Sequence, residues 1–281
     1  MHYKHFDLDP ITGALGGEIH GIDLSEPVDD EMLQEIYDAL LQNLVLFFRD
    51  QHITPAQQIE FGRRFGELHV HPLIPHLKGY PEILALGGGE GPRPQTRNSN
   101  VWHADLTYIA TPPMGSILRG VEVPEAGGDT MWTNMYAAYD ALSERMKRFL
   151  SDLSAVHDIA KTSRREDLST KAGVDRFWKS QETTPPVTHP VIRIHPEINQ
   201  KCIFVSRAFT THIPDLEPRE SESVLRFLME HIEKPEFQCR FHWRKDSIAF
   251  WDNRCTQHYA VVDYSERRTM HRVTICGDQP H

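Results

Sequence analysis

Three residues of this chain have the types that a non-haem Fe(II) site requires. They are His103 and Asp105, in the segment Val101-Trp102-His103-Ala104-Asp105, and His258 far downstream. Two imidazoles and one carboxylate hold such a metal on one face and leave the opposite face open for a co-substrate and O₂. Arg268, ten residues after His258, supplies a cation for a dicarboxylate co-substrate. The combination predicts an oxygenase with these three residues as metal ligands.

The His-x-Asp spacing alone is weak evidence, because the chain has 17 histidines. A second His-x-Asp starts at His5, near the N-terminus, where ordering is least assured. A His-x-Glu starts at His195, in a segment typical of a turn between two strands. An arginine ten residues after a histidine is a more specific signal, since only His258 among the 17 histidines is followed by an arginine at that spacing. The same ligand types also bind Zn²⁺, so a zinc hydrolase stays open at this point.

Composition favours one large domain, residues 1–281, with a sizeable core, because 39% of the residues are hydrophobic. The net charge of −10 argues against general nucleic-acid binding. The longest apolar run, Leu44 to Phe48, is far too short for a membrane span, and the N-terminus has no signal-peptide pattern. Four cysteines without a Cys-x-x-Cys pair indicate reduced thiols. We therefore expect a cytoplasmic protein that binds neither nucleic acid nor membrane.

Strand patterns dominate the chain after Trp102, and helices interrupt them at irregular intervals. The pattern predicts a mainly β fold with inserted helices and a double-stranded β-helix (jelly-roll) core, rather than a doubly wound α/β fold. Expected strands are 44–48, 115–123, 191–194, 202–205, 247–251, 259–262 and 269–276, and the β-favouring run 102–109 carries the first two ligands. Expected helices are 29–42, 54–65, 135–151 and 218–233. Residues 87–100 are expected to form a loop, and the long segments 71–91 and 161–184 are candidate lids.

Five ordered motifs extend through the chain. They are Arg64-Phe65-Gly66-Glu67-Leu68-His69, Trp102-His103-x-Asp105, Gly127-Gly128-Asp129-Thr130, Trp251-Asp252-Asn253-Arg254-x-Thr256-Gln257-His258 and Arg267-Arg268-x-Met270-His271-Arg272. Together they resemble the taurine dioxygenase family of Fe(II)- and 2-oxoglutarate-dependent oxygenases, over nearly the whole chain from about Gly13 onward. The resemblance implies Fe(II) on His103, Asp105 and His258, with 2-oxoglutarate and O₂ as co-substrates. It also implies that Arg268 and Thr130 bind the distal carboxylate of 2-oxoglutarate. Without it, Gly127 to Thr130 would be read as a tight turn and a strand residue.

Arg272 indicates the primary substrate. In an extended strand it shares a face with Arg268, about 13 Å further along. Two arginines beside one dianion favour a second anionic group, and in the family the equivalent residue binds a sulfonate. The resemblance also aligns His71, Leu106 and Phe209 with substrate contacts.

The sequence departs from the family at other pocket positions. An expected tyrosine is replaced by Ile74, and an expected aromatic residue is replaced near Ser163. The family's pocket asparagine aligns with Asn98, Ser99 or Asn100. These departures make a sulfonate or related anion a firmer expectation than taurine itself.

The leading expectation is hydroxylation of the carbon next to a sulfonate, as in taurine. The products would be an aldehyde and sulfite, together with succinate and CO₂. The alternative is the same chemistry on an alkyl sulfate ester or a phenoxyalkanoate-type acid. A binding protein without turnover is the third reading, disfavoured because all three ligands and Arg268 are present. The resemblance also leads us to expect a homo-oligomer, either a dimer or a tetramer.

Overall fold

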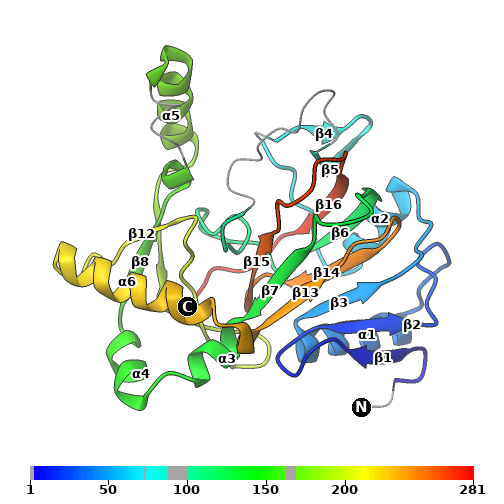
Figure 1. Ribbon diagram of the computed structural model, residues 1–281, viewed down its shortest axis with the longest axis horizontal. Coiled ribbons are helices and arrows are strands. Elements are labelled where there is room, and N and C mark those ends of the chain that lie inside the picture. The colour runs from blue at the N-terminus through cyan, green and yellow to red at the C-terminus, as the bar shows by residue number, and fades with distance from the viewer. Residues whose placement is uncertain (1–2, 73, 88–99, 163–168) are drawn as a thin grey trace.

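The computed structural model describes residues 3–72, 74–87, 100–162 and 169–281, and β-sheets form most of its core (Figure 1). The largest sheet has eight strands in the order β1-β2-β3-β14-β6-β16-β5-β4. Its neighbouring strands are antiparallel, apart from the parallel pair β2 and β3. The strands are β1 (Asp7–Pro10), β2 (Gly17–His20), β3 (Val45–Phe48), β14 (Ile248–Asp252), β6 (Gly115–Glu122), β16 (Thr269–Ile275), β5 (Tyr80–Gly87) and β4 (His76–Leu77).

A second sheet, here called the small sheet, has the strand order β13-β7-β15 and packs against the large one. Its strands are β13 (Gln238–Phe241), β7 (Thr130–Asn134) and β15 (Thr256–Ala260). A further three-stranded sheet joins β12 (Thr210–His212), β8 (Ser154–His157) and β9 (Val187–Pro190), and a hairpin joins β10 (Ile192–Ile194) to β11 (Lys201–Ile203).

The large sheet is buried on both faces, because apolar side chains alternate between its faces along the central strands. Phe47 and Trp251 lie in the cluster shared with the small sheet. Their chain neighbours Phe48 and Phe250 lie in the opposite cluster, with α1 (Asp30–Asn43) and α2 (Pro55–Arg63). The near-continuous apolar run Val45–Phe48 is therefore a central strand, as the sequence predicted.

Aromatic contacts join the two sheets. The ring of Phe47 stacks on Phe241 of β13 at 4.0 Å and meets the edge of Trp132 of β7 at 5.4 Å. Trp132 in turn lies 5.8 Å from Trp251 of β14. All four side chains are almost fully buried, so this layer contributes strongly to the rigidity of the strands that carry the site.

The helices expected at 29–42 and 54–65 form, and each begins at a side-chain cap. The Asp29 side chain accepts a hydrogen bond from the Met32 amide at the start of α1. Thr54 and Gln57 form a reciprocal capping box at the start of α2, with Pro55 in its first turn. These contacts satisfy amide groups that a helix N-terminus leaves without partners.

The single helix expected over 135–151 is wrong. The chain forms two short helices there, and Ser143 starts the second by accepting from the Met146 amide. The remaining helices of the described residues are α3 (Met135–Asp140), α4 (Glu144–Leu150), α5 (Lys171–Thr183) and α6 (Pro218–Ile232), with 3-10 turns η1 (Ile159–Thr162) and η3 (Pro235–Phe237).

Four other expectations need correction. The run 102–109 is not a strand, since only His103 makes a β-bridge and residues 105–108 form a turn. The segment 71–91 is not one long loop, because β4 and β5 lie within it and β5 pairs with β16. The segment 161–184 is not one long loop either, because α5 lies within it. The strand expected at 259–262 is β15, which starts at Thr256.

Of the expected loop at 87–100, residues 88–99 lie outside the described part of the chain. The prediction of a mainly β chain with inserted helices is confirmed.

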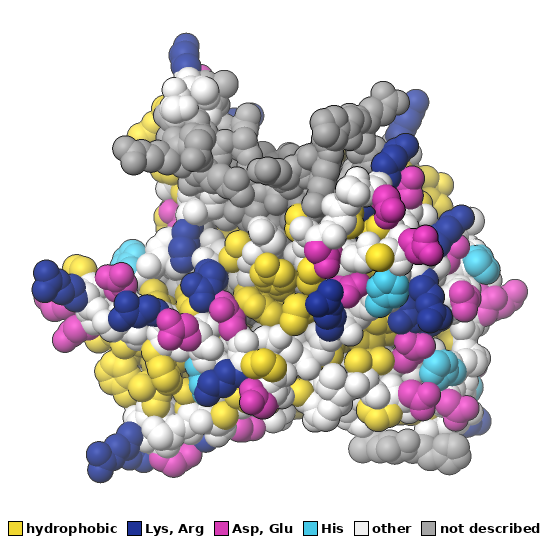
Figure 2. Space-filling view, in the orientation of Figure 1, with side chains coloured by type: hydrophobic (Ala, Val, Ile, Leu, Met, Phe, Trp, Pro, Cys, Tyr) yellow, Lys and Arg dark blue, Asp and Glu magenta, His cyan; other side chains and the backbone are white. Residues whose placement is uncertain are grey.

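No helix in the described ranges is long and apolar enough to cross a membrane. On the face shown in Figure 2, acidic and basic side chains are interspersed, and apolar side chains gather near the middle, over the region of β7 and β15 in Figure 1.

Candidate active site

His103 and His258 lie side by side because their backbones pair. Each amide donates to the other residue's carbonyl, at 3.1 and 2.8 Å. His258 belongs to β15, whereas His103 lies outside the named strands and makes an isolated β-bridge to it. Their ring centroids are 4.2 Å apart. Two residues 155 positions apart in sequence are thus held in one fixed register.

A sharp turn brings Asp105 back toward the two imidazoles. Leu106, the next residue, has a left-handed φ of 53°, which is unusual for a non-glycine residue. The side chain of Asn253 holds this turn. Its Oδ1 accepts from the Asp105 amide at 2.7 Å, and its Nδ2 donates to the Asp105 carbonyl at 3.0 Å and to the Pro113 carbonyl at 3.3 Å. Asn253 is 1% exposed, so these partners replace water.

The carboxylate of Asp105 faces both imidazoles through one oxygen. Its Oδ1 lies 3.9 Å from Nε2 of His103 and 3.9 Å from Nε2 of His258. Ser116 donates to the other oxygen at 3.1 Å, and Arg272 Nη1 donates to Oδ1 at 2.7 Å. A carboxylate oxygen has two lone pairs, so Oδ1 can accept from Arg272 and still face a cation.

The protonation states suit a metal. Burial lowers the pKa of His258 to about 3, and burial likewise lowers the pKa of His103, so both rings are neutral at pH 7. Nδ1 of His103 lies 2.7 Å from the Val101 carbonyl, which places the proton there and leaves a lone pair on Nε2. Burial alone would raise the pKa of Asp105, but Arg272 and the two imidazoles outweigh it and lower that pKa, so Asp105 is ionised.

These three side chains form the one group of metal-binding type found among the described residues, with ligand atoms within 4.8 Å of one another. Two neutral imidazoles and one carboxylate fit a divalent first-row metal with open positions. The structure therefore brings together the three ligands predicted from sequence. His195, the competing candidate, lies in the turn between β10 and β11, as predicted.

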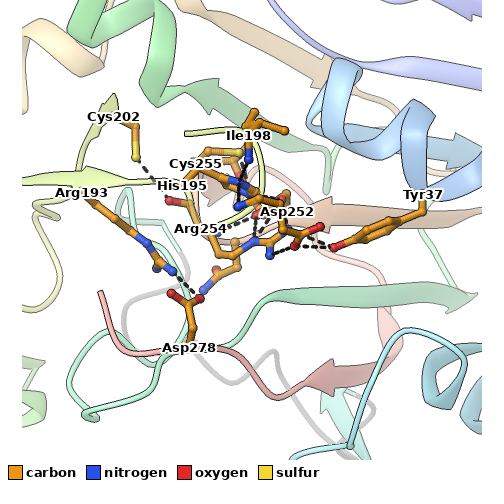
Figure 3. A network of polar contacts seen from close by, with 12 residues as sticks. Tyr37, Arg193, His195, Ile198, Cys202, Asp252, Arg254, Cys255 and Asp278 are labelled. Atoms are coloured by element: carbon orange, nitrogen blue, oxygen red, sulfur yellow. Dashed lines mark hydrogen bonds and ion pairs between the residues drawn. The ribbon is translucent and has the colours of Figure 1, made fainter. Parts of the chain in front are cut away.

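A buried ion network anchors the turn that carries Asn253 (Figure 3). Arg254 pairs with both carboxylate oxygens of Asp252, at 3.0 and 2.6 Å, and with Glu197. His195 Nε2 lies 3.1 Å from Asp252, and Tyr37 of α1 donates to Glu197 at 2.6 Å. The network joins α1, the β10–β11 turn and the β14–β15 turn, so it positions the segment that leads to His258.

A second cationic position lies at Arg268. Gly127 and Gly128 adopt φ values of 79° and 70°, and a Cβ on Gly127 would lie 2.6 Å from an Asp263 carboxylate oxygen. The Gly128 carbonyl accepts a hydrogen bond from Arg268 Nε at 3.1 Å. Nearby, Trp243 Nε1 donates to Thr130 Oγ1 at 2.9 Å, so the Thr130 hydroxyl keeps its own proton for another acceptor. Gly127–Asp129 thus forms an irregular segment with left-handed backbone at both glycines, and its Gly128 carbonyl orients Arg268.

A cavity of about 470 Å³ is lined by the three candidate metal ligands and by both arginines. Every candidate residue proposed from the sequence lines it: His71, Leu106, Phe209 and Arg272 for substrate, Thr130 and Arg268 for co-substrate, and the three ligands. Arg268 and Arg272 therefore both line this cavity, as their four-residue spacing predicted. Ile74 also lines the cavity. Asn100 is exposed, whereas Asn98, Ser99 and Ser163 lie outside the described residues.

Sequence reasoning missed three residues of this site, Tyr108, Ser116 and Asn253. Tyr108 lines the cavity three residues after Asp105, and its spacing alone did not distinguish it from a strand residue. Ser116 lies inside a buried strand and has no motif. Asn253 stood within a quoted motif, next to Asp252 and Arg254, and that position was the available signal.

Comparisons with known proteins agree with this geometry. A family model described as "Taurine catabolism dioxygenase TauD, TfdA family" matches residues 7–274. The chain is 36% identical over 280 residues to an alkylsulfatase of Acinetobacter baylyi, covering 98% of this chain and 86% of that protein. It is 35% identical over 284 residues to an alpha-ketoglutarate-dependent sulfate ester dioxygenase of Pseudomonas putida, covering 99% and 92%. The crystal structure of a taurine dioxygenase from Burkholderia xenovorans matches with a TM-score of 0.83 at 37% identity, covering 98% of this chain and 91% of that one.

Proposed function

Because the chain belongs to the taurine catabolism dioxygenase TauD, TfdA family and is a 2-oxoglutarate-dependent dioxygenase, we propose that it uses Fe(II) to hydroxylate a carbon next to a sulfur oxyanion. His103, Asp105 and His258 hold the iron, and Arg272 holds the anionic group of the substrate. The observation that carries the proposal is the cavity that joins this ligand set to two arginines.

Bound iron with 2-oxoglutarate supplies the oxidising power, with succinate and CO₂ as products. The chain's own residues position the reactants. Arg268, oriented by the Gly128 carbonyl, pairs with the distal carboxylate of 2-oxoglutarate, because a guanidinium binds two oxygens at once. Thr130 donates its hydroxyl proton to the same carboxylate, since its oxygen already accepts from Trp243. The apolar walls of the cavity exclude water from the reacting carbon.

The lining of the cavity favours an uncharged substrate tail over taurine. Among the described lining residues, Asp105 is the sole carboxylate, and it faces the metal position. An ammonium group would therefore have no carboxylate partner there, and burying a cation without one is costly. Most other lining residues are apolar: Ile74, Leu86, Leu106, Leu118, Ile159, Phe209, Trp251, Ala260, Val261, Val262 and Met270. An alkyl sulfonate or an alkyl sulfate ester suits this cavity best, and the names of two relatives support the sulfate ester.

The two substrates give distinguishable products. Hydroxylation next to a sulfonate creates an alcohol that collapses to an aldehyde and sulfite. Hydroxylation next to a sulfate ester creates one that collapses to an aldehyde and sulfate. In both, one oxygen atom of O₂ enters the substrate and the other enters succinate.

The family relationship supports two further proposals. The large and small sheets, which face each other through Phe47 and Trp132, form the two sheets of a jelly-roll core. The protein also assembles as a homodimer or homotetramer, which light scattering of the purified protein would measure.

The test is succinate yield from the purified protein with Fe(II), ascorbate, O₂ and 2-oxoglutarate. Hexanesulfonate, hexyl sulfate, taurine and a phenoxyalkanoic acid are compared, with sulfite and sulfate assayed in parallel. We expect succinate with equimolar sulfite or sulfate from the hexyl compounds, and little from taurine. Turnover of the phenoxyalkanoic acid alone would move the substrate to a carboxylate, and no succinate with any of them would refute the assignment.

A further inference from the structure

A backbone contact fixes which ring nitrogen of His71 carries the proton. The Ile74 amide donates to His71 Nδ1 at 3.1 Å, so Nδ1 is the unprotonated acceptor. Burial, with Arg272 nearby, lowers the pKa of His71 to about 4, which keeps the ring neutral at pH 7. A neutral imidazole with Nδ1 as acceptor carries its proton on Nε2.

That proton points to Tyr108. His71 Nε2 lies 3.4 Å from the Tyr108 hydroxyl, a long hydrogen bond in which the imidazole is the donor and the phenol oxygen the acceptor. The phenol then has its own proton left to donate. Among the described residues, no acceptor for that proton lies within hydrogen-bonding distance, although Tyr108 is 7% exposed. A buried phenol with an unused donor is costly unless a ligand accepts from it.

The position of Tyr108 indicates what that ligand is. Its ring packs edge-on against Phe209 at 4.8 Å, which fixes its direction, and both residues line the cavity with Arg272. His71, Tyr108 and Arg272 all line this cavity, and, beside the larger effect of burial, the positive charge of Arg272 acts to lower the pKa of both other groups. An anionic group bound at Arg272 would therefore share the cavity with the phenol.

We propose that the Tyr108 hydroxyl donates directly to the anionic group of the substrate beside Arg272, and that His71 acts through Tyr108 instead of touching the substrate. The proposal rests on the proposed function and adds a residue that sets specificity. A guanidinium can bind two oxygens of an anion. A sulfonate or sulfate directs a third oxygen out of the guanidinium plane, toward Tyr108, whereas the remaining lone pairs of a bidentate carboxylate lie in that plane. Tyr108 therefore selects tetrahedral sulfur oxyanions over planar carboxylates.

The experiment compares Tyr108→Phe with wild type in anaerobic calorimetry, on the Fe(II)- and 2-oxoglutarate-loaded protein. We expect affinity for hexyl sulfate and hexanesulfonate to fall about 10- to 100-fold, as for a lost hydrogen bond to a charged group. Affinity for heptanoate should change less than about threefold, and 2-oxoglutarate affinity should not change. Tyr80→Phe, a phenol on β5 outside the cavity, is the matched control.

A double-mutant cycle tests the role of His71. If His71 acts through Tyr108, His71→Ala weakens sulfate binding in wild type but adds little in the Tyr108→Phe background. Additive losses would overturn that part of the proposal. Equal hexyl sulfate affinity in wild type and Tyr108→Phe would overturn the role of Tyr108 while the proposed function stands. Wild-type protein that binds neither sulfur oxyanion would overturn the proposed function itself.

Discussion

Removing the Asn253 side chain is the change that best separates the positioning of Asp105 from the stability of the fold. Asn253 touches no metal-facing atom, yet its amide bonds the amide and carbonyl groups of Asp105 and the carbonyl of Pro113. It follows Asp252, which ends β14, and precedes by five residues His258, the second histidine of the proposed ligand set. Asn253→Ala therefore cuts the one side-chain link, among the described residues, between the Asp105 turn and the turn that leads to His258.

The expected loss follows from the contacts. The variant leaves the buried amide and carbonyl of Asp105 without their partner, and each such group costs about 1–3 kcal/mol. We expect the free energy of unfolding of the metal-free protein to fall by roughly 2–5 kcal/mol. Because the ligand turn at Leu106 is held in a left-handed conformation, loss of the clamp also lets Asp105 move. Fe(II) affinity should fall about 10- to 100-fold, as for other residues that orient metal ligands.

The assay pairs urea denaturation with anaerobic Fe(II) calorimetry. Asn134→Ala is the matched control, because Asn134 is also buried, caps α3 and bonds the Ala14 carbonyl, but does not line the cavity. The control should lose stability and keep Fe(II) affinity. If Asn253→Ala loses only stability and binds Fe(II) like the control, the positioning argument is refuted.

Three further outcomes are expected. Arg272→Ala should lower kcat/KM for the best sulfur oxyanion at least about 100-fold and leave 2-oxoglutarate binding mostly intact. Arg268→Ala should instead weaken 2-oxoglutarate binding. Normal turnover by Arg272→Ala would refute the assignment of Arg272 to the substrate anion. Thr130→Val should raise the KM for 2-oxoglutarate about tenfold without changing that for substrate. His157 has a pKa lowered to about 3 by burial, so below pH 6.5 the unfolded chain binds a proton that the folded chain does not. The free energy of unfolding should therefore decrease as the pH is lowered from 6.5 to 3, by up to about 1.4 kcal/mol per pH unit. His157→Gln should reduce this slope, as measured by urea denaturation.

Short-range signals in the sequence correctly predicted helices whose start depends on contacts within one turn. Asp29 and Thr54 cap helices that the sequence placed correctly, because a cap acts within one turn. Ser143 offered the same signal and was overlooked, so two helices were read as one. The motif residues were proposed for the site for a different reason, since they match the order and spacing of motifs in a known family.

The parts that were missed depend on contacts between distant residues. Residues 102–109 favour a strand by composition, but the amide of Asp105 bonds the side chain of Asn253, 148 positions away, and not a neighbouring strand. The segment 71–91 appeared to be a lid because its partner strand, β16, comes almost two hundred residues later. Neither propensity nor periodicity carries such information. Tyr108 was missed for the same reason, since its role depends on the Ile74 amide and His71.

Charge balance links the two arginines to the choice of substrate. Among the described residues that line the cavity, Arg268 and Arg272 are cationic, Asp105 is anionic, and both histidine ligands are neutral. With a divalent metal bound, the site carries a net charge of about three plus, which 2-oxoglutarate and a monoanionic substrate together neutralise. Zwitterionic taurine would leave one positive charge unbalanced in a largely apolar cavity, and that is costly. The same balance explains why Arg272 pairs with Asp105 at 2.7 Å, since the ion pair keeps a buried guanidinium compensated until the substrate anion arrives.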